Sequence, residues 1–164
     1  MRKRLAKFLL PELNRVFWVR LALVAGTTWV ACRFVCIPTR IRGASMEPTY
    51  HDGGFNFCWR LRYRFRPPRS GEIVVVRLTG MRAMLLKRVV AEAGERVEFR
   101  DGQLHVNGQA RAEPYVVLPC DWDLPPRTVE PGCVYVVGDN RSVPMECHQF
   151  GQVSLARIVG GVVW

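Results

Sequence analysis

The longest apolar stretch of the chain lies near its beginning, from Val16 to Ile37, and only Arg20 and Arg33 interrupt it. A helix of this length spans about 30 Å, which matches the hydrocarbon core of a bilayer. Arginines near the two ends of such a helix can extend their charged heads to the polar interfaces. The pattern therefore predicts a transmembrane helix over 16–37.

A cleaved signal peptide is the alternative interpretation of the same stretch. Its uncharged part runs only from Leu21 to Cys32, which is the size of the apolar region of a signal peptide. Trp18, near one end, is typical of an interfacial belt and favours the spanning helix.

Beyond residue 38 the apolar residues fall into short β-branched or aromatic runs bounded by Gly, Pro, Asp or Asn. These runs cover 73–76, 84–90, 96–100, 103–106, 115–118, 133–137 and 156–163. Asp101-Gly102 and Asn107-Gly108 are dipeptides typical of tight hairpins. The sequence predicts a mainly β class, with an antiparallel barrel-like β-domain over 38–164 after one N-terminal transmembrane helix.

The net charge of +10 is concentrated at the beginning of the chain. Residues 1–42 hold nine Lys or Arg and one acid, so the remaining residues are close to neutral. Five basic residues precede Val16 and two follow Ile37 closely, which predicts a cytoplasmic N-terminus over 1–15 and an extracytoplasmic domain over 38–164. The excess charge is explained by the membrane flank and gives no reason to expect nucleic acid.

Arginines and aromatic residues alternate between Trp59 and Arg69. Such a stripe occurs in nucleic-acid interfaces, but next to a predicted membrane span it favours a lipid-facing surface. We expect the lipid bilayer to be a partner and nucleic acid not to be one.

Three clusters carry candidate chemistry: 43–49 (GASMEPT), 85–90 (LLKRVV) and 136–141 (VVGDNR). The first contains Ser45, close to the predicted bilayer. The second contains Lys87, which is the only lysine after Lys7. Burial in an apolar strand lowers the pKa of a lysine and makes it a possible base. Most strand lysines face solvent, and alternation alone leaves open whether Lys87 or Arg88 points inward.

In this order and spacing, the three clusters resemble those of the signal peptidase I family, which cleaves signal peptides with a Ser/Lys pair. The resemblance implies Ser45 as nucleophile and Lys87, facing inward, as general base. It places the oxyanion at the backbone N–H of Ser45, with Gly43 where some members have a hydroxyl. Asp139, Asn140 and Ser142 are the implied supporting residues. None of the three histidines, His51, His105 and His148, lies in a family-like triad context.

The resemblance also implies a substrate bound as an extended strand between Ile41–Ala44 and Met84–Leu86, cut after small residues in an Ala-x-Ala pattern. The implied substrate-binding residues are Ile41, Arg42, Ala44, Met46, Met84, Leu85 and Leu86. Only 50 residues separate Lys87 from Gly138, so the accessory insert of the family should be short here, around 95–132.

The third cluster departs from the family pattern. Pro144 stands where the family has a serine that hydrogen-bonds the lysine, and Glu146 and His148 replace a buried Asp/Arg pair. Either Ser142 or water is then expected to orient Lys87. An inactive homologue is an alternative.

The resemblance implies a serine endopeptidase anchored in the bacterial cytoplasmic membrane, with signal peptides of exported pre-proteins as partners. A dedicated processing peptidase of a conjugation or secretion system, a self-cleaving repressor and a non-catalytic membrane-anchored β-module are the alternatives. We expect no cofactor and no metal, because no metal-ligand spacing is present. Cysteines 58, 120, 133 and 147 allow three disulfide pairings.

Overall fold

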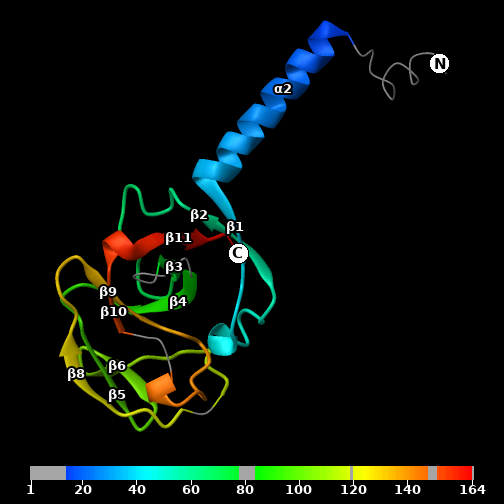
Figure 1. Cartoon of the computed structure of the whole chain (residues 1–164). Helices are drawn as coiled ribbons and strands as arrows, with labels where there is room; N and C mark the ends of the chain where they lie inside the picture. Colours follow the sequence, from blue (N-terminus) through cyan, green and yellow to red (C-terminus); the bar gives the residue numbers. More distant parts are fainter. Residues whose placement is uncertain (1–13, 78–83, 119, 148–150, 164) are drawn as a thin grey trace, which may run out of the picture. The chain divides into compact units, whose positions relative to one another are not determined.

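The computed structural model describes residues 14–77, 84–118, 120–147 and 151–163 (Figure 1). The chain divides into two compact units, Met1–Cys36 and Ile37–Trp164.

The first unit contains one apolar helix, α2 (Arg15–Val30), which continues as the π-helical turn η1 (Ala31–Val35). Asn14 caps its beginning, since the side-chain oxygen accepts a hydrogen bond of 2.9 Å from the N–H of Phe17. None of the residues of α2 is buried. By length and composition, Arg15–Val35 is a candidate membrane span. The helical stretch ends two residues before the predicted boundary, because Cys36 is already extended.

The second unit is built from short strands joined by tight turns. They are β1 (Cys36–Arg40), β2 (Phe55–Trp59), β3 (Ile73–Arg77), β4 (Met84–Ala91), β5 (Arg96–Arg100), β6 (Gln103–Val106), β7 (Gln109–Ala110), β8 (Leu124–Thr128), β9 (Cys133–Val137), β10 (Gly151–Ser154) and β11 (Ile158–Val162). Three 3₁₀ turns, η2 (Ala44–Met46), η3 (Met145–Cys147) and η4 (Leu155–Arg157), complete it.

The strands form two sheets. The larger has the order β1-β2-β11-β3-β4-β9-β10, and the smaller has the order β7-β6-β5-β8. The predicted mainly antiparallel β class is confirmed, but both sheets of the described chain are open and no closed barrel forms. The smaller sheet covers Arg96–Thr128, which is the region of the expected insert.

Local turn chemistry accounts for the hairpins of the smaller sheet. Asp101 and Gly102 have φ of 48° and 74°, and Asn107 and Gly108 have φ of 54° and 77°. Both central residues of each turn are therefore left-handed, as the tightest hairpins require. The predicted β5–β6 and β6–β7 hairpins are confirmed.

The strand predicted over 115–118 is wrong, because the structure has turns and irregular chain there. The hydroxyl of Tyr115 bonds to Glu113, and Val117 remains 64% exposed. Conversely, the sequence pattern did not predict β8, because this strand contains two prolines. Prolines are tolerated here because β8 is an edge strand.

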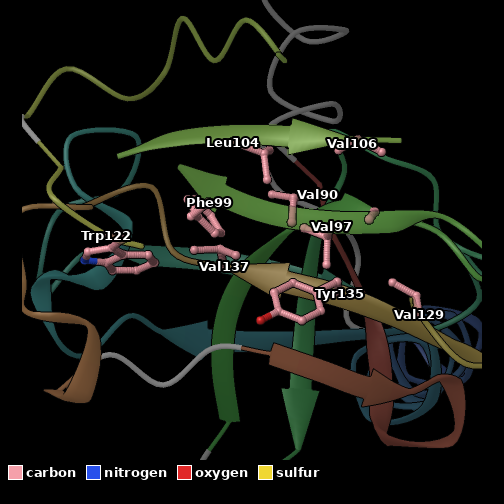
Figure 2. Packing of buried hydrophobic residues seen from close by; sticks show 10 residues of the cluster. Val90, Val97, Phe99, Leu104, Val106, Trp122, Val129, Tyr135 and Val137 are labelled. Carbon is pink, nitrogen blue, oxygen red and sulfur yellow. The ribbon is translucent and has the colours of Figure 1, made fainter. Parts of the chain in front are cut away.

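The smaller sheet packs against strands of the larger one through a shared apolar core (Figure 2). Phe99 and Trp122 meet edge to face, with ring centroids 5.4 Å apart. Val90 of β4 and Val137 of β9 belong to the same cluster. The insert region is therefore joined to the strand that carries Lys87.

Candidate active site

Ser45 lies in the 3₁₀ turn η2, which packs on β4. Two features shape the approach to this turn. Gly43 has φ of 90° and ψ of 153°, a conformation essentially restricted to glycine. Its N–H donates a 2.8 Å hydrogen bond to Oδ1 of Asp52. The glycine that replaces a hydroxyl in the family pattern is thus explained by its backbone conformation.

Asn140 holds η2 from the other side. Its backbone N–H donates to the carbonyl of Ser45 at 3.1 Å, and its side-chain Nδ2 donates to the carbonyl of Ala44 at 3.0 Å. The hydroxyl of Ser142 donates to Oδ1 of Asn140 at 2.7 Å. Ser142 therefore stabilises the Asn140 amide, and the structure gives no support to its expected role as the partner of Lys87.

Lys87 is only 2% exposed, in the middle of β4 opposite Val74. Burial is the main cause that lowers the pKa of its amine to about 8. Two charges act on it in opposite directions: Asp139 raises the pKa and Arg141 lowers it. About a tenth of the amine is therefore uncharged at pH 7, and about half at pH 8.

No hydrogen bond joins the Ser45 hydroxyl to the Lys87 amine in the described part of the chain. Catalytic hydrogen bonds are often long without substrate and tighten in the complex. The structure brings together the two elements that carry these residues, η2 and β4.

Arg88, the neighbour of Lys87 on β4, is also largely covered. Its side chain is 11% exposed and forms a two-point ion pair with Asp139, at 2.8 and 2.6 Å. The carboxylate of Asp139 is fully buried and also accepts a hydrogen bond from the hydroxyl of Thr49. This network links β4, the loop after β9 and the segment after η2.

Only some of the residues implied in substrate binding lie together in the structure. Ile41, Met46 and Leu86 are buried in one apolar cluster, and Met84 packs against it. Leu85 lies outside that cluster and is half-buried. Arg42 and Ala44 are exposed.

The ion pair of Glu113 with Arg141 escaped the sequence reasoning. Glu113 forms a two-point ion pair with Arg141, at 3.0 and 2.6 Å. Nothing in the local pattern signals this pair, because the partners are 28 residues apart. Glu146, which replaces an acid of the family pattern, is exposed, and His148 lies outside the described residues.

Metal and disulfide chemistry find no support in the described residues. No group of three or more His, Cys, Asp or Glu among them is placed to hold a metal ion. No disulfide joins Cys58, Cys120 and Cys133, and the side chain of Cys147 lies outside the described part of the chain.

Comparisons with known proteins address the family of this chain. The model of the family "Signal peptidase, peptidase S26" matches residues 14–164. A probable signal peptidase I-1 of Synechocystis sp. is 33% identical over 77% of this chain and 69% of its own length. The signal peptidase I of Bacillus caldolyticus is 32% identical over 84% of this chain and 88% of its own.

Two further matches cover a smaller share of one of the two proteins compared. A probable thylakoidal processing peptidase 2 of Arabidopsis thaliana is 33% identical over 77% of this chain, but the chain spans only 37% of its length. A solved signal peptidase I structure from Enterococcus faecalis aligns over 58% of this chain and 97% of its own, at 26% identity and a TM-score of 0.46. Assignment rests on the family match and the sequence relatives: this chain belongs to the S26 family of signal peptidases.

Proposed function

We propose that this protein is a membrane-anchored serine endopeptidase that removes signal peptides from exported pre-proteins, with Ser45 as nucleophile and Lys87 as general base. The observation that carries the proposal is the buried Lys87 amine, whose pKa is lowered to about 8, on the strand against which the Ser45 turn packs. A lysine in this state can accept a proton where a charged lysine cannot.

The steps follow from this arrangement. The neutral Lys87 amine takes the proton of the Ser45 hydroxyl while the oxygen attacks the scissile carbonyl. The tetrahedral intermediate collapses to an acyl-enzyme as the protonated Lys87 gives its proton to the leaving amine. Water, deprotonated by Lys87, then attacks the ester carbonyl, and the protonated Lys87 returns the proton to the Ser45 oxygen as the signal peptide is released. Asn140 contributes by holding the carbonyls of Ala44 and Ser45, and thereby the direction of the hydroxyl.

The apolar cluster of Ile41, Met46 and Leu86 supports recognition of small apolar side chains, such as the alanines of an Ala-x-Ala site. A substrate paired as an extended strand presents alternate side chains to such a surface. The candidate span Arg15–Val35 would anchor the protein, and the basic residues before it favour a cytoplasmic N-terminus with the β unit outside. The exposed Phe65 and Arg64 are suited to contact with anionic lipid headgroups.

The test is cleavage of a pre-protein with an Ala-x-Ala site by the full-length protein in detergent. Ser45→Ala and Lys87→Ala should each reduce kcat/KM at least a thousandfold, because each removes a partner of one proton transfer. Lys7→Ala is the matched lysine control, and His51→Ala and His105→Ala test a histidine base. Retention of parental activity by Lys87→Ala would exclude the dyad.

The pH dependence gives an independent check. Only the neutral form of Lys87 can act as base, so kcat/KM should rise with pH and level off above a midpoint near the pKa of about 8. A flat profile between pH 6 and 9, measured on single turnovers, would contradict a lysine base.

A further inference from the structure

A buried ion pair connects the insert to the loop that supports the Ser45 turn. The guanidinium of Arg141 is 1% exposed, bonds to Glu113 through two nitrogens and donates from Nε to the carbonyl of Gly138 at 2.7 Å. It lies near the rings of Phe99 and Trp122, at 5.3 and 5.8 Å from their centroids. Glu113 belongs to the segment between β7 and β8, so the acid comes from the insert and the base from the active-site loop.

The same carboxylate reaches the second ion pair of the site. The hydroxyl of Tyr115 donates to Oε1 of Glu113 at 2.7 Å, and the guanidinium of Arg88 lies 3.8 Å from the centroid of the Tyr115 ring. Arg88 in turn holds Asp139. Glu113 is therefore linked to both charged residues of the loop, Asp139 and Arg141.

These two residues flank Asn140, which bonds to the carbonyls of Ala44 and Ser45. They are also the charges that act on Lys87. Of the other elements against Lys87, β3 places the apolar Val74 opposite it, and η2 brings the uncharged Ser45. Asp139 and Arg141 are thus the two charges through which a change in this ion-pair network reaches Lys87.

We propose that Glu113 is a positioning residue for the Ser45–Lys87 pair: it neutralises Arg141, holds the 138–142 loop against the Ser45 turn and limits the positive potential at the Lys87 amine. The proposal rests on the proposed function for its catalytic meaning. The family pattern leads one to expect a covered acid at the position of Glu146, but Glu146 is exposed. The proposal gives that role to Glu113, whose side chain is largely covered.

The sign of the effect separates this role from a purely structural one. Glu113→Gln keeps the shape and an acceptor oxygen but leaves the Arg141 charge uncompensated. The midpoint of the kcat/KM profile should then move to lower pH by about half a unit, and plateau kcat should fall about tenfold with KM within about twofold. Arg141→Met removes the positive charge and should move the midpoint to higher pH. Glu113→Asp, which keeps the charge, should restore the parental midpoint.

The matched control is Glu98→Gln, which removes a largely buried carboxylate of the same insert that pairs with Arg100. Its midpoint should equal that of the parent. The double variant Glu113→Gln/Arg141→Met should lie between the two single variants, as coupling of the two charges requires. Midpoints that move in the same direction in both single variants, or that stay within error of the parent, overturn the proposal.

A second readout does not depend on cleavage. In a Ser45→Ala background, the pH dependence of Lys87 acetylation by acetic anhydride, followed by mass spectrometry, reports the titration of the amine directly. Glu113→Gln should lower its midpoint and Arg141→Met should raise it. If the parent cleaves no pre-protein while these shifts occur, the proposed function fails and the positioning role stands. If the parent cleaves the pre-protein and these shifts are absent, the positioning role fails and the proposed function stands.

Discussion

At the scale of single residues, burial of Lys87 lowers the stability of the folded protein but favours the neutral amine that a base requires. A lysine that is 2% exposed favours its neutral form, and the ordinary pKa of 10.5 falls to about 8. The folded protein therefore binds fewer protons at this site than the unfolded chain between pH 8 and 10.5. Stability should rise with pH across this window, and below pH 8 the full penalty of burying the charge remains.

Replacing this lysine with an apolar side chain should stabilise the protein while abolishing a lysine base. Lys87→Met should raise the free energy of unfolding by about 3 kcal/mol at pH 7, and by about half as much at pH 9.5, where the parent amine is already neutral when folded. Urea unfolding of the full-length protein in detergent, followed by tryptophan fluorescence, measures the gain. Arg96→Met, at an exposed basic strand position, is the control and should change stability little. An equal gain at both pH values would contradict a titrating Lys87.

At the scale of elements, the Ser45 turn is positioned by its two flanks rather than by regular pairing. Asp52 holds Gly43 on one side, and Asn140 holds Ala44 and Ser45 on the other. Neither flank is a strand, so the turn is held by these hydrogen bonds, by its own bond from the Glu47 N–H to the Ala44 carbonyl, and by the positive φ of Gly43.

Gly43 should be sensitive because of its backbone conformation. A Cβ at this position meets no atom within 4 Å, so a substitution is limited by φ of 90° and not by space. Gly43→Ala should cost about 1–3 kcal/mol of local strain and lower kcat by about tenfold or more as the turn shifts. Gly132→Ala is the matched control, since Gly132 also has φ of 75° and open space, away from the site. Equal kcat in the two variants, with equal losses of stability, would show that the turn tolerates the change.

At the scale of the whole molecule, the two units differ in charge and in exposure to solvent. The first has seven Lys or Arg against one acid and an apolar helix with no buried residue. The second has basic and acidic residues in near balance, and it contains the sheets, the buried core and the candidate site. An apolar helix with no buried residue among the described ones is suited to lipid.

The charge asymmetry predicts the orientation of the protein. Protease added to intact spheroplasts should remove a C-terminal tag and spare an N-terminal one, because five basic residues precede the candidate span. Immunoblots of the two tags measure this, and lysis before protease treatment should expose both. Protection of the C-terminal tag in intact spheroplasts would reverse the orientation and leave the β unit on the wrong side for exported pre-proteins.

Sequence alone determined those features that depend on a few neighbouring residues. The apolar run is long enough for one spanning helix, and Asp101-Gly102 and Asn107-Gly108 specify hairpins because both residues of each pair tolerate positive φ. The clusters around Ser45, Lys87 and Asn140 were sufficient to indicate the family, although the roles of these residues stay predictions. Alternation along β4 could not decide between Lys87 and Arg88, because a period of two assigns faces without saying which is buried.

Only the tertiary structure decided how the site is supported. Arg88 meets Asp139 across 51 residues, and Arg141 meets Glu113 across 28. A local sequence pattern does not predict which distant charge will neutralise a buried one, because the pairing depends on how sheets and loops pack. Residues 115–118 were expected to form a strand. In the structure they form an irregular segment that places the Tyr115 ring against the Arg88 guanidinium.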